Sequence, residues 1–113
     1  MNMENTKEII DKLYFCAAQS ERCHLACHRE KDKGTLERCM MLDQDCTEIC
    51  RLTAQLLERN SENSELLLQT CAEVCIKCAK ECETHSEMEH CKKCAEACRA
   101  VAELCNIAHS NAG

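Results

Sequence analysis

Cysteine placement constrains the fold of this chain more than any other sequence feature. Fourteen of the 113 residues are cysteine, and they recur at helical spacing in four groups. At about 100° per residue, each group lies on one narrow stripe of its own helix. Four helices that each present a stripe of thiols are typical of a metal-binding protein. The groups are Cys16, Cys23 and Cys27; Cys39, Cys46 and Cys50; Cys71, Cys75, Cys78 and Cys82; and Cys91, Cys94, Cys98 and Cys105.

Turn-forming and aromatic residues are scarce. The chain has no proline and two glycines, which favours uninterrupted helices over a sandwich or a barrel. Aromatic residues make up only 2%, so cysteine, which is often fully buried, has to fill much of the interior. Short connections place neighbouring helices antiparallel. The sequence therefore predicts one all-α domain over residues 1–113, an antiparallel up-down-up-down four-helix bundle with a Cys-lined core.

Local signals predict the helix ends. Asn5 with Glu8, and Ser86 with Glu89, have the spacing of capping boxes, and Gly34 suits a turn. The expected helices run from Asn5 to about Lys31, from the turn at Gly34 to about Arg59, from the polar 60–64 segment to about His85, and from Ser86 to about His109.

Antiparallel alignment arranges the thiols in levels along a channel about 17–20 Å long. One level holds Cys27, Cys39, Cys82 and Cys91, the next holds Cys23, Cys46, Cys78 and Cys94, and the remaining cysteines lie deeper.

The two ends of the channel differ. Towards the chain termini the stripes continue into an apolar plug formed by Ile9, Leu13, Leu57, Leu67 and Leu68. At the opposite end His85 lies on the stripe and is the best candidate for a mouth ligand. His109 falls on the stripe at the plugged end, and we assign it no role. Further mouth candidates are His24, His28, Met40, Met88 and His90.

Charge favours Cu(I) as the ion. Soft thiolates select Cu(I), Zn²⁺ or iron–sulfur clusters. When each Cu(I) takes two thiolates and each thiolate bridges two ions, the core is neutral, whereas Zn²⁺ held by four thiolates leaves two negative charges per site. Cysteines at i and i+4 can share an ion, and this spacing occurs five times. The predicted capacity is on the order of a dozen Cu(I) ions.

Four Cys-rich helices, repeated CxxxC pairs facing inward and a His/Met-bearing mouth resemble the bacterial copper storage proteins. The similarity spans nearly the whole chain. It implies a four-helix bundle that stores multiple Cu(I) ions through its cysteine thiolates and receives them at the mouth. It also implies association into homo-oligomers.

Other readings remain open. An iron–sulfur electron-transfer protein is suggested by Cys75-x-x-Cys78 and Cys91-x-x-Cys94-x-x-x-Cys98, although such clusters usually rest on loops. A zinc-thiolate buffer, a thiol-redox protein and a metal-free core of small residues are further alternatives.

Two details concern residues near the stripes. Glu21-x-x-His24 and Glu87-x-x-His90 have the spacing of di-iron ligands. Glu21 and His90, however, lie about 140° and about 100° from the Cys stripe, which predicts that they do not share the interior with the thiols. Asp43 falls near the edge of its stripe and is expected to be a boundary residue rather than a ligand.

Charge and hydropathy limit the partners. The net charge of −6 and the lack of a basic patch argue against nucleic acid, and no apolar run approaches the length of a membrane span. The first residues lack the features of an export signal, so we expect a cytoplasmic protein whose thiols stay reduced. No catalytic constellation is apparent, and we expect a non-enzymatic role.

Overall fold

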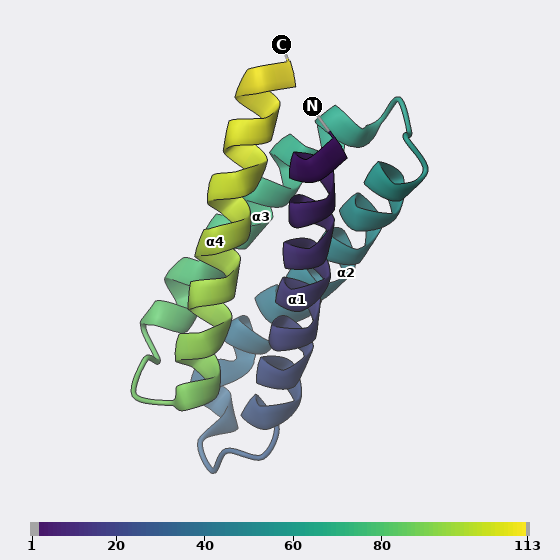
Figure 1. The fold of residues 1–113 in the computed structure, drawn as a ribbon. Coiled ribbons are helices and arrows are strands. Elements are labelled where there is room, and N and C mark those ends of the chain that lie inside the picture. Colours follow the sequence, from purple (N-terminus) through teal and green to yellow (C-terminus); the bar gives the residue numbers. More distant parts are fainter. Residues whose placement is uncertain (1–2, 113) are drawn as a thin grey trace.

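The computed structural model describes the backbone of residues 3–112 and the side chains of residues 5–108. Within this range four long helices follow one another, with one short 3-10 helix between the first two (Figure 1). The described residues contain no strand, which confirms the all-α class. The elements are α1 (Met3–Cys27), η1 (Lys33–Leu36), α2 (Glu37–Glu58), α3 (Ser64–Glu83) and α4 (Glu89–Ala112).

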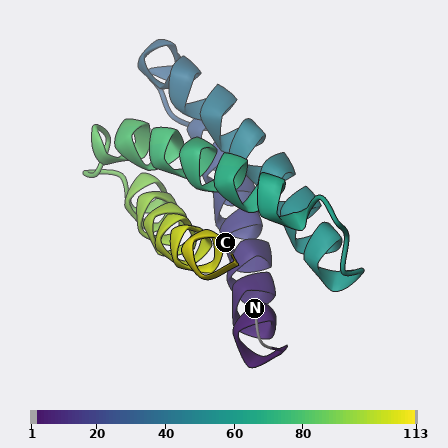
Figure 2. The same ribbon diagram turned by 90° about the horizontal axis from the view of Figure 1, so that it is seen from above.

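The four helices surround one core. α1 packs against α2 and α4, and α3 packs against the same two helices. Both chain ends lie beside the α2–α3 connection, and the other two connections lie at the opposite end (Figure 1). This is the predicted antiparallel up-down-up-down bundle. Seen from above, the helices are inclined to one another rather than parallel (Figure 2). The bundle measures 45 × 20 × 19 Å.

The connection from α1 to α2 differs from the expectation. α1 ends at Cys27, four residues before the expected Lys31, and the chain then forms η1. Leu36 in η1 is fully buried in the core cluster. Burial of this leucine outweighs the helix propensity of the preceding charged residues. Gly34 lies within η1 and does not have a positive φ, so it is not a left-handed helix cap.

The left-handed cap belongs to the end of α2 instead. Asn60 has a φ of 55°, which is tolerated by asparagine better than by most residues. The Ser61 N–H donates to the Leu56 carbonyl at 2.9 Å, and the Asn60 N–H donates to the Leu57 carbonyl at 3.2 Å. These two bonds form a Schellman motif that satisfies the last carbonyls of α2.

Neither predicted capping box begins a helix. Met3 and Glu4, both good helix formers, already belong to α1 and place Asn5 inside the helix. α4 starts at Glu89, and the Lys92 N–H donates to the Met88 carbonyl at 3.1 Å. Met88, not Ser86, therefore stands at the cap position of α4. α3 ends at Glu83, two residues before the expected His85.

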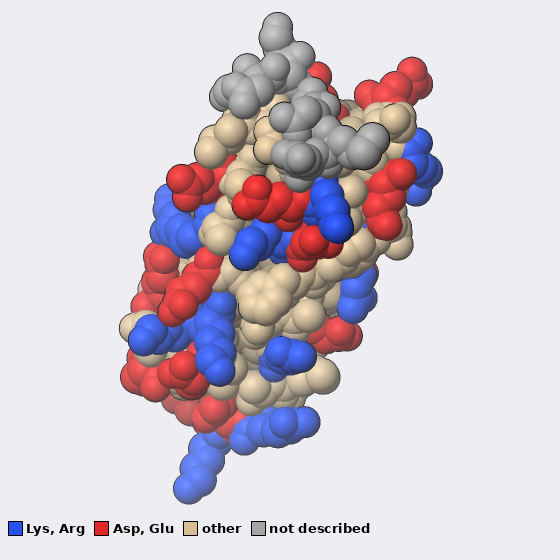
Figure 3. Space-filling model, in the orientation of Figure 1, with Lys and Arg blue, Asp and Glu red and all other residues tan. Residues whose placement is uncertain are grey.

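The outer face is charged. Lysine, arginine, aspartate and glutamate side chains cover much of the face seen in Figure 3, with signs interspersed. None of the described helices combines the length and the apolar character needed to cross a bilayer.

Candidate metal centre

All fourteen cysteines face the interior. Each one is 0% exposed, and each is a free thiol. All four helices contribute, because each directs one stripe at the common axis. Neighbouring sulfurs lie 3.5–4.0 Å apart where they contact across the core. Sulfurs at this separation can share one ion with metal–sulfur bonds of about 2.3 Å.

Every stripe has the same register. α3 carries cysteine at i, i+4, i+7 and i+11, and the other helices carry the same four inward positions. One position in each of those helices is not cysteine, and its side chain is at most 1% exposed. All four helices therefore share one pattern of inward positions, although the spacing of their cysteines differs. The three exceptions are Ser20 in α1, Asp43 in α2 and Val101 in α4.

The thiol array is densest around Cys46. Its Sγ lies 3.5 Å from Cys98 Sγ, 3.6 Å from Cys75 Sγ and 3.8 Å from Cys16 Sγ. Cys46 thus belongs with the deeper thiols and not only at the expected level of Cys23, Cys78 and Cys94. The inclination of the helices produces this shift.

The end of the array nearest the chain termini is closed by apolar side chains. Cys50 and Cys71 are 3.8 Å apart, and Cys105 lies next to Cys71. Beyond them Ile9, Leu13, Leu57 and Leu68 are buried, whereas Leu67 is half-buried. This end is therefore a closed apolar plug, as expected. The side chain of His109 lies outside the described residues.

Asp43 is a central residue of the array, so the expectation of a boundary position is wrong. Its Oδ1 accepts hydrogen bonds from the thiols of three cysteines at 3.3, 3.5 and 3.4 Å. Burial raises the pKa of the Asp43 carboxyl to about 9. Asp43 can therefore keep its proton at neutral pH. The three donors are Cys78, Cys82 and Cys94.

The sequence position of Asp43 is consistent with its place among the thiols. Asp43 stands four residues after Cys39 and three before Cys46, so it lies on the stripe itself. The cysteine pattern of α3, with a member at each of the four steps, is the signal that could have identified it. Ser20 fills the matching step of α1, where its Oγ lies 3.6 Å from Cys94 Sγ.

His90 is the histidine that reaches the thiols. Its Nδ1 lies 3.4 Å from Cys23 Sγ and 3.5 Å from Cys91 Sγ. Its Nε2 lies 3.2 Å from Glu30 Oε1. The ligand atoms of His90, Cys23, Cys27 and Cys91 all lie within 4.8 Å of one another. The expectation that His90 cannot share the interior is therefore wrong, because a side chain in the first turn of α4 can fold over the open end.

His85 makes a different contact. Its Nε2 lies 3.0 Å from Glu81 Oε2, four residues earlier. Among the described residues, no group of three or more ligand atoms includes His85. The structure thus brings His90, rather than His85, to the thiols.

The remaining mouth candidates lie beside the array. Met40 and Met88 are half-buried and pack against the core cluster. His24 and His28 line a surface pocket between α1 and α2 together with Met40. Met41 is exposed, so only one of the two adjacent methionines faces inward.

Comparison with known proteins agrees with this geometry. The sequence model of the copper storage protein family matches residues 2–110. The cysteine-rich protein YhjQ of Bacillus subtilis is 32% identical over 96 residues, which cover 85% of this chain and 88% of that protein.

Two solved structures share the fold. A cytosolic copper storage protein from Streptomyces lividans, described with five coppers, is 35% identical with a TM-score of 0.91, over 95% of this chain and 93% of that chain. The Cu(I)-bound copper storage protein BsCsp3 is 29% identical with a TM-score of 0.86, over 90% of this chain and 95% of that chain. The family match spans nearly the whole chain and the thiol array spans the whole core, so this chain belongs to the copper storage protein family.

Proposed function

We propose that this protein stores Cu(I) ions inside the bundle, bound to the thiolates of its fourteen cysteines. The observation that carries this proposal is the continuous array of buried free thiols, whose sulfurs approach one another to 3.5–4.0 Å. Membership of the copper storage family supports it. Multiple Cu(I) ions are the cargo, and the protein holds them without catalytic turnover.

The net charge of the buried core favours Cu(I) over divalent ions. Burial raises the pKa of the Cys27 thiol above its usual value, so the metal-free thiol is neutral. Each Cu(I) that replaces one thiol proton leaves the charge of the core unchanged. Zn²⁺ bound by four thiolates would instead leave a net negative charge in the dry interior.

The two alternative metal functions have less support. An iron–sulfur cluster would need only one group of four thiolates, such as Cys16, Cys46, Cys50 and Cys75, and would leave the rest of the array without a role. Zinc buffering meets the charge cost described above. Both alternatives also predict a small number of ions per chain, which a stoichiometry measurement can distinguish.

We propose the open end of the bundle as the route of loading. His90, whose Nδ1 faces Cys23 and Cys91, is the residue best placed to receive Cu(I) there. Glu30 orients the ring through Nε2. Asp43 would hold the thiols of the next level in place through the hydrogen bonds that its Oδ1 accepts from them.

Location and assembly are further proposals. The similar Streptomyces lividans protein is described as cytosolic, and we propose a cytoplasmic location for this chain as well. The exposed aromatic side chains of Tyr14 and Phe15, the latter 53% exposed, support self-association into a homo-oligomer. We propose no nucleic-acid partner, in keeping with the net charge of −6.

A Cu(I) titration of the reduced, metal-free protein against a strong competing chelator tests the storage function. The expected stoichiometry is close to one Cu(I) per thiol, with no absorption band in the visible. Saturation at one or two ions would contradict storage, and a brown chromophore in the protein as isolated would indicate an iron–sulfur cluster.

A further inference from the structure

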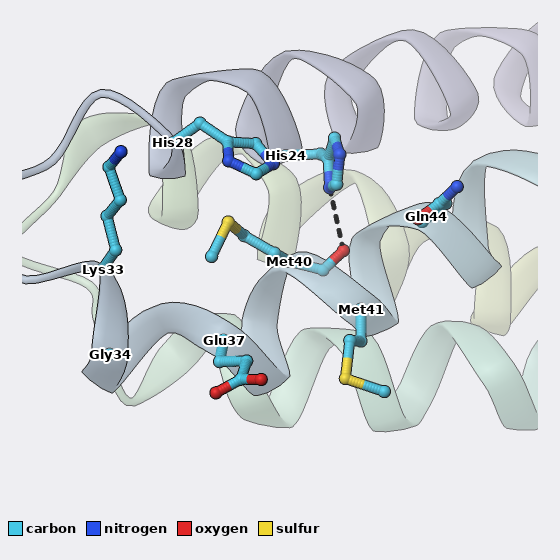
Figure 4. A pocket seen from close by; sticks show the side chains of 8 residues that line it. All are labelled: His24, His28, Lys33, Gly34, Glu37, Met40, Met41 and Gln44. Carbon is cyan, nitrogen blue, oxygen red and sulfur yellow. Dashed lines mark hydrogen bonds between the residues drawn. The ribbon is translucent and has the colours of Figure 1, made fainter.

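A surface pocket between α1 and α2 gathers soft and nitrogen ligands away from the thiol array. Its lining includes His24 of α1, His28 directly after the end of α1, and Met40 of α2 (Figure 4). The two imidazole rings stand one helical turn apart, with centroids 4.8 Å apart and planes at 82°. Histidines at i and i+4 present their ring nitrogens on one helix face, which is a common way to hold a metal ion.

One hydrogen bond prepares His24 as a ligand. His24 Nδ1 lies 3.0 Å from the main-chain carbonyl oxygen of Met40. A carbonyl oxygen only accepts, so Nδ1 carries the hydrogen and Nε2 keeps its lone pair. The same bond orients the ring, as hydrogen bonds to metal-bound histidines usually do.

Met40 supplies a third donor. Figure 4 shows its thioether extending towards the two rings, whereas the Met41 and Glu37 side chains point away from them. Met40 is half-buried, and Met41 is 63% exposed. The two adjacent methionines are thus a matched pair that both line the pocket, of which only Met40 extends towards the imidazole rings.

We propose that His24, His28 and Met40 form a surface Cu(I) site that is separate from the thiolate core. This inference rests on the proposed storage function, which supplies the ion. The donors would be two imidazole nitrogens and one thioether sulfur, and binding them releases no thiol proton.

The donor set selects the ion. Cu(I) accepts few ligands and prefers soft ones, whereas structural Zn²⁺ sites are almost always four-coordinate. No described group of three or more His, Cys, Asp or Glu ligand atoms includes His24 or His28.

The position of the site gives it a role. His24 and His28 directly follow Cys23 and Cys27, two thiols of the group that contains His90. The end of α1 and the residue that follows it therefore carry outward imidazoles beside inward thiols. Neutral donors bind Cu(I) more weakly than bridging thiolates, so the site holds an exchangeable ion beside the mouth of the store.

Two chelators of different strength test this site. With a weak Cu(I) chelator the wild-type protein is expected to hold one more Cu(I) per chain than with a strong chelator. The additional ion is expected to be lost in His24→Ala/His28→Ala and in Met40→Leu, and kept in Met41→Leu. In NMR spectra of protein labelled at the methionine methyl carbons, the Met40 resonance should shift when the additional Cu(I) binds, and the Met41 resonance should not.

The outcomes separate this site from the storage function. Absence of an additional ion in the wild type, or its retention in His24→Ala/His28→Ala or in Met40→Leu, would overturn the surface site while the strongly bound capacity remains. Loss of the strongly bound capacity in the wild type would instead overturn storage. Circular dichroism of each variant checks that the bundle is folded.

Discussion

Asp43 combines full burial with an ionisable carboxyl, and this pairing makes the metal-free protein sensitive to pH. The pKa of the carboxyl is about 9 in the bundle and about 4 in an unfolded chain. Between these values the unfolded state loses a proton that the folded state keeps. The contribution of Asp43 to the free energy of unfolding should therefore be fully present below about pH 4, and it should fall by up to ~1.4 kcal/mol per pH unit between about pH 4 and about pH 9.

The substitution Asp43→Asn removes this titration while keeping the shape and the acceptor oxygen. We expect the reduced, metal-free variant to lose less stability than the wild type between about pH 5 and about pH 7, where cysteine is little ionised even when unfolded. Urea unfolding at both pH values measures the difference. Asp45→Asn, an exposed change on the same helix, is the control and should follow the wild type. Parallel pH profiles for wild type and Asp43→Asn would show that the carboxyl titrates normally.

His90 and His85 offer a second comparison between single residues. His90 faces Cys23 and Cys91, whereas His85 pairs with Glu81. We expect His90→Ala to slow the loading of the first Cu(I) ions several-fold with little loss of total capacity, because the thiols remain in place. Stopped-flow mixing with a Cu(I)–chelator complex measures the rate.

His85→Ala is the matched control, and it should load at the wild-type rate. The opposite result, a slow His85→Ala and an unchanged His90→Ala, would favour the mouth residue chosen from the helical stripe alone. It would mean that the His85 ring leaves Glu81 when copper arrives.

At the scale of whole helices, the sequence was informative because the pattern was redundant. Fourteen cysteines on four stripes predicted the bundle, its inward faces and its closed end, because several residues independently indicate the same face of each helix. The side chains of Asp43 and His90 could not be placed in this way. Their contacts depend on helix inclination and on side-chain reach, and neither is encoded in spacing along a single helix.

Helix ends were predicted less well for a related reason. Capping boxes are short patterns that compete with burial. At the α1–α2 connection the burial of Leu36 decided the path, and at the start of α4 the cap position is occupied by Met88. These choices depend on contacts between elements that lie far apart in the sequence.

The common register of the stripes predicts a gain of capacity in α4. Val101 is 1% exposed and occupies the inward step between Cys98 and Cys105. Val101→Cys would complete the i, i+4, i+7, i+11 pattern, as in α3. We expect about one additional strongly bound Cu(I) per chain, at a cost of ~1 kcal/mol of metal-free stability from the smaller side chain.

Ala100→Cys provides the control for Val101→Cys, because Ala100 is an exposed neighbour on the same helix. It adds a thiol without adding to the array, so its strongly bound capacity should equal that of the wild type. An equal gain in both variants would mean that the count of cysteines matters and their inward register does not.

The molecule as a whole has to be stable both empty and loaded, and its core composition suits that requirement. Protonated thiols behave as small apolar groups, so they can pack at the centre before any ion arrives. The apolar plug adds burial that does not depend on metal, and Leu13 within it is fully buried. The bundle should therefore exist before copper binds, in contrast to small zinc domains that fold only around their metal. That residues 1–113 form one domain stays a prediction.

Circular dichroism of the reduced, metal-free protein is expected to show a strongly helical spectrum and a cooperative thermal transition. Adding Cu(I) should raise the transition temperature with little change in helicity, because the ion binds the folded state and leaves its backbone in place. Leu13→Ala, which opens a cavity in the plug, should cost about 2–5 kcal/mol in the metal-free protein. A metal-free chain without helical signal, which gains helix in proportion to added Cu(I), would mean that copper builds the core and that no preformed array receives it.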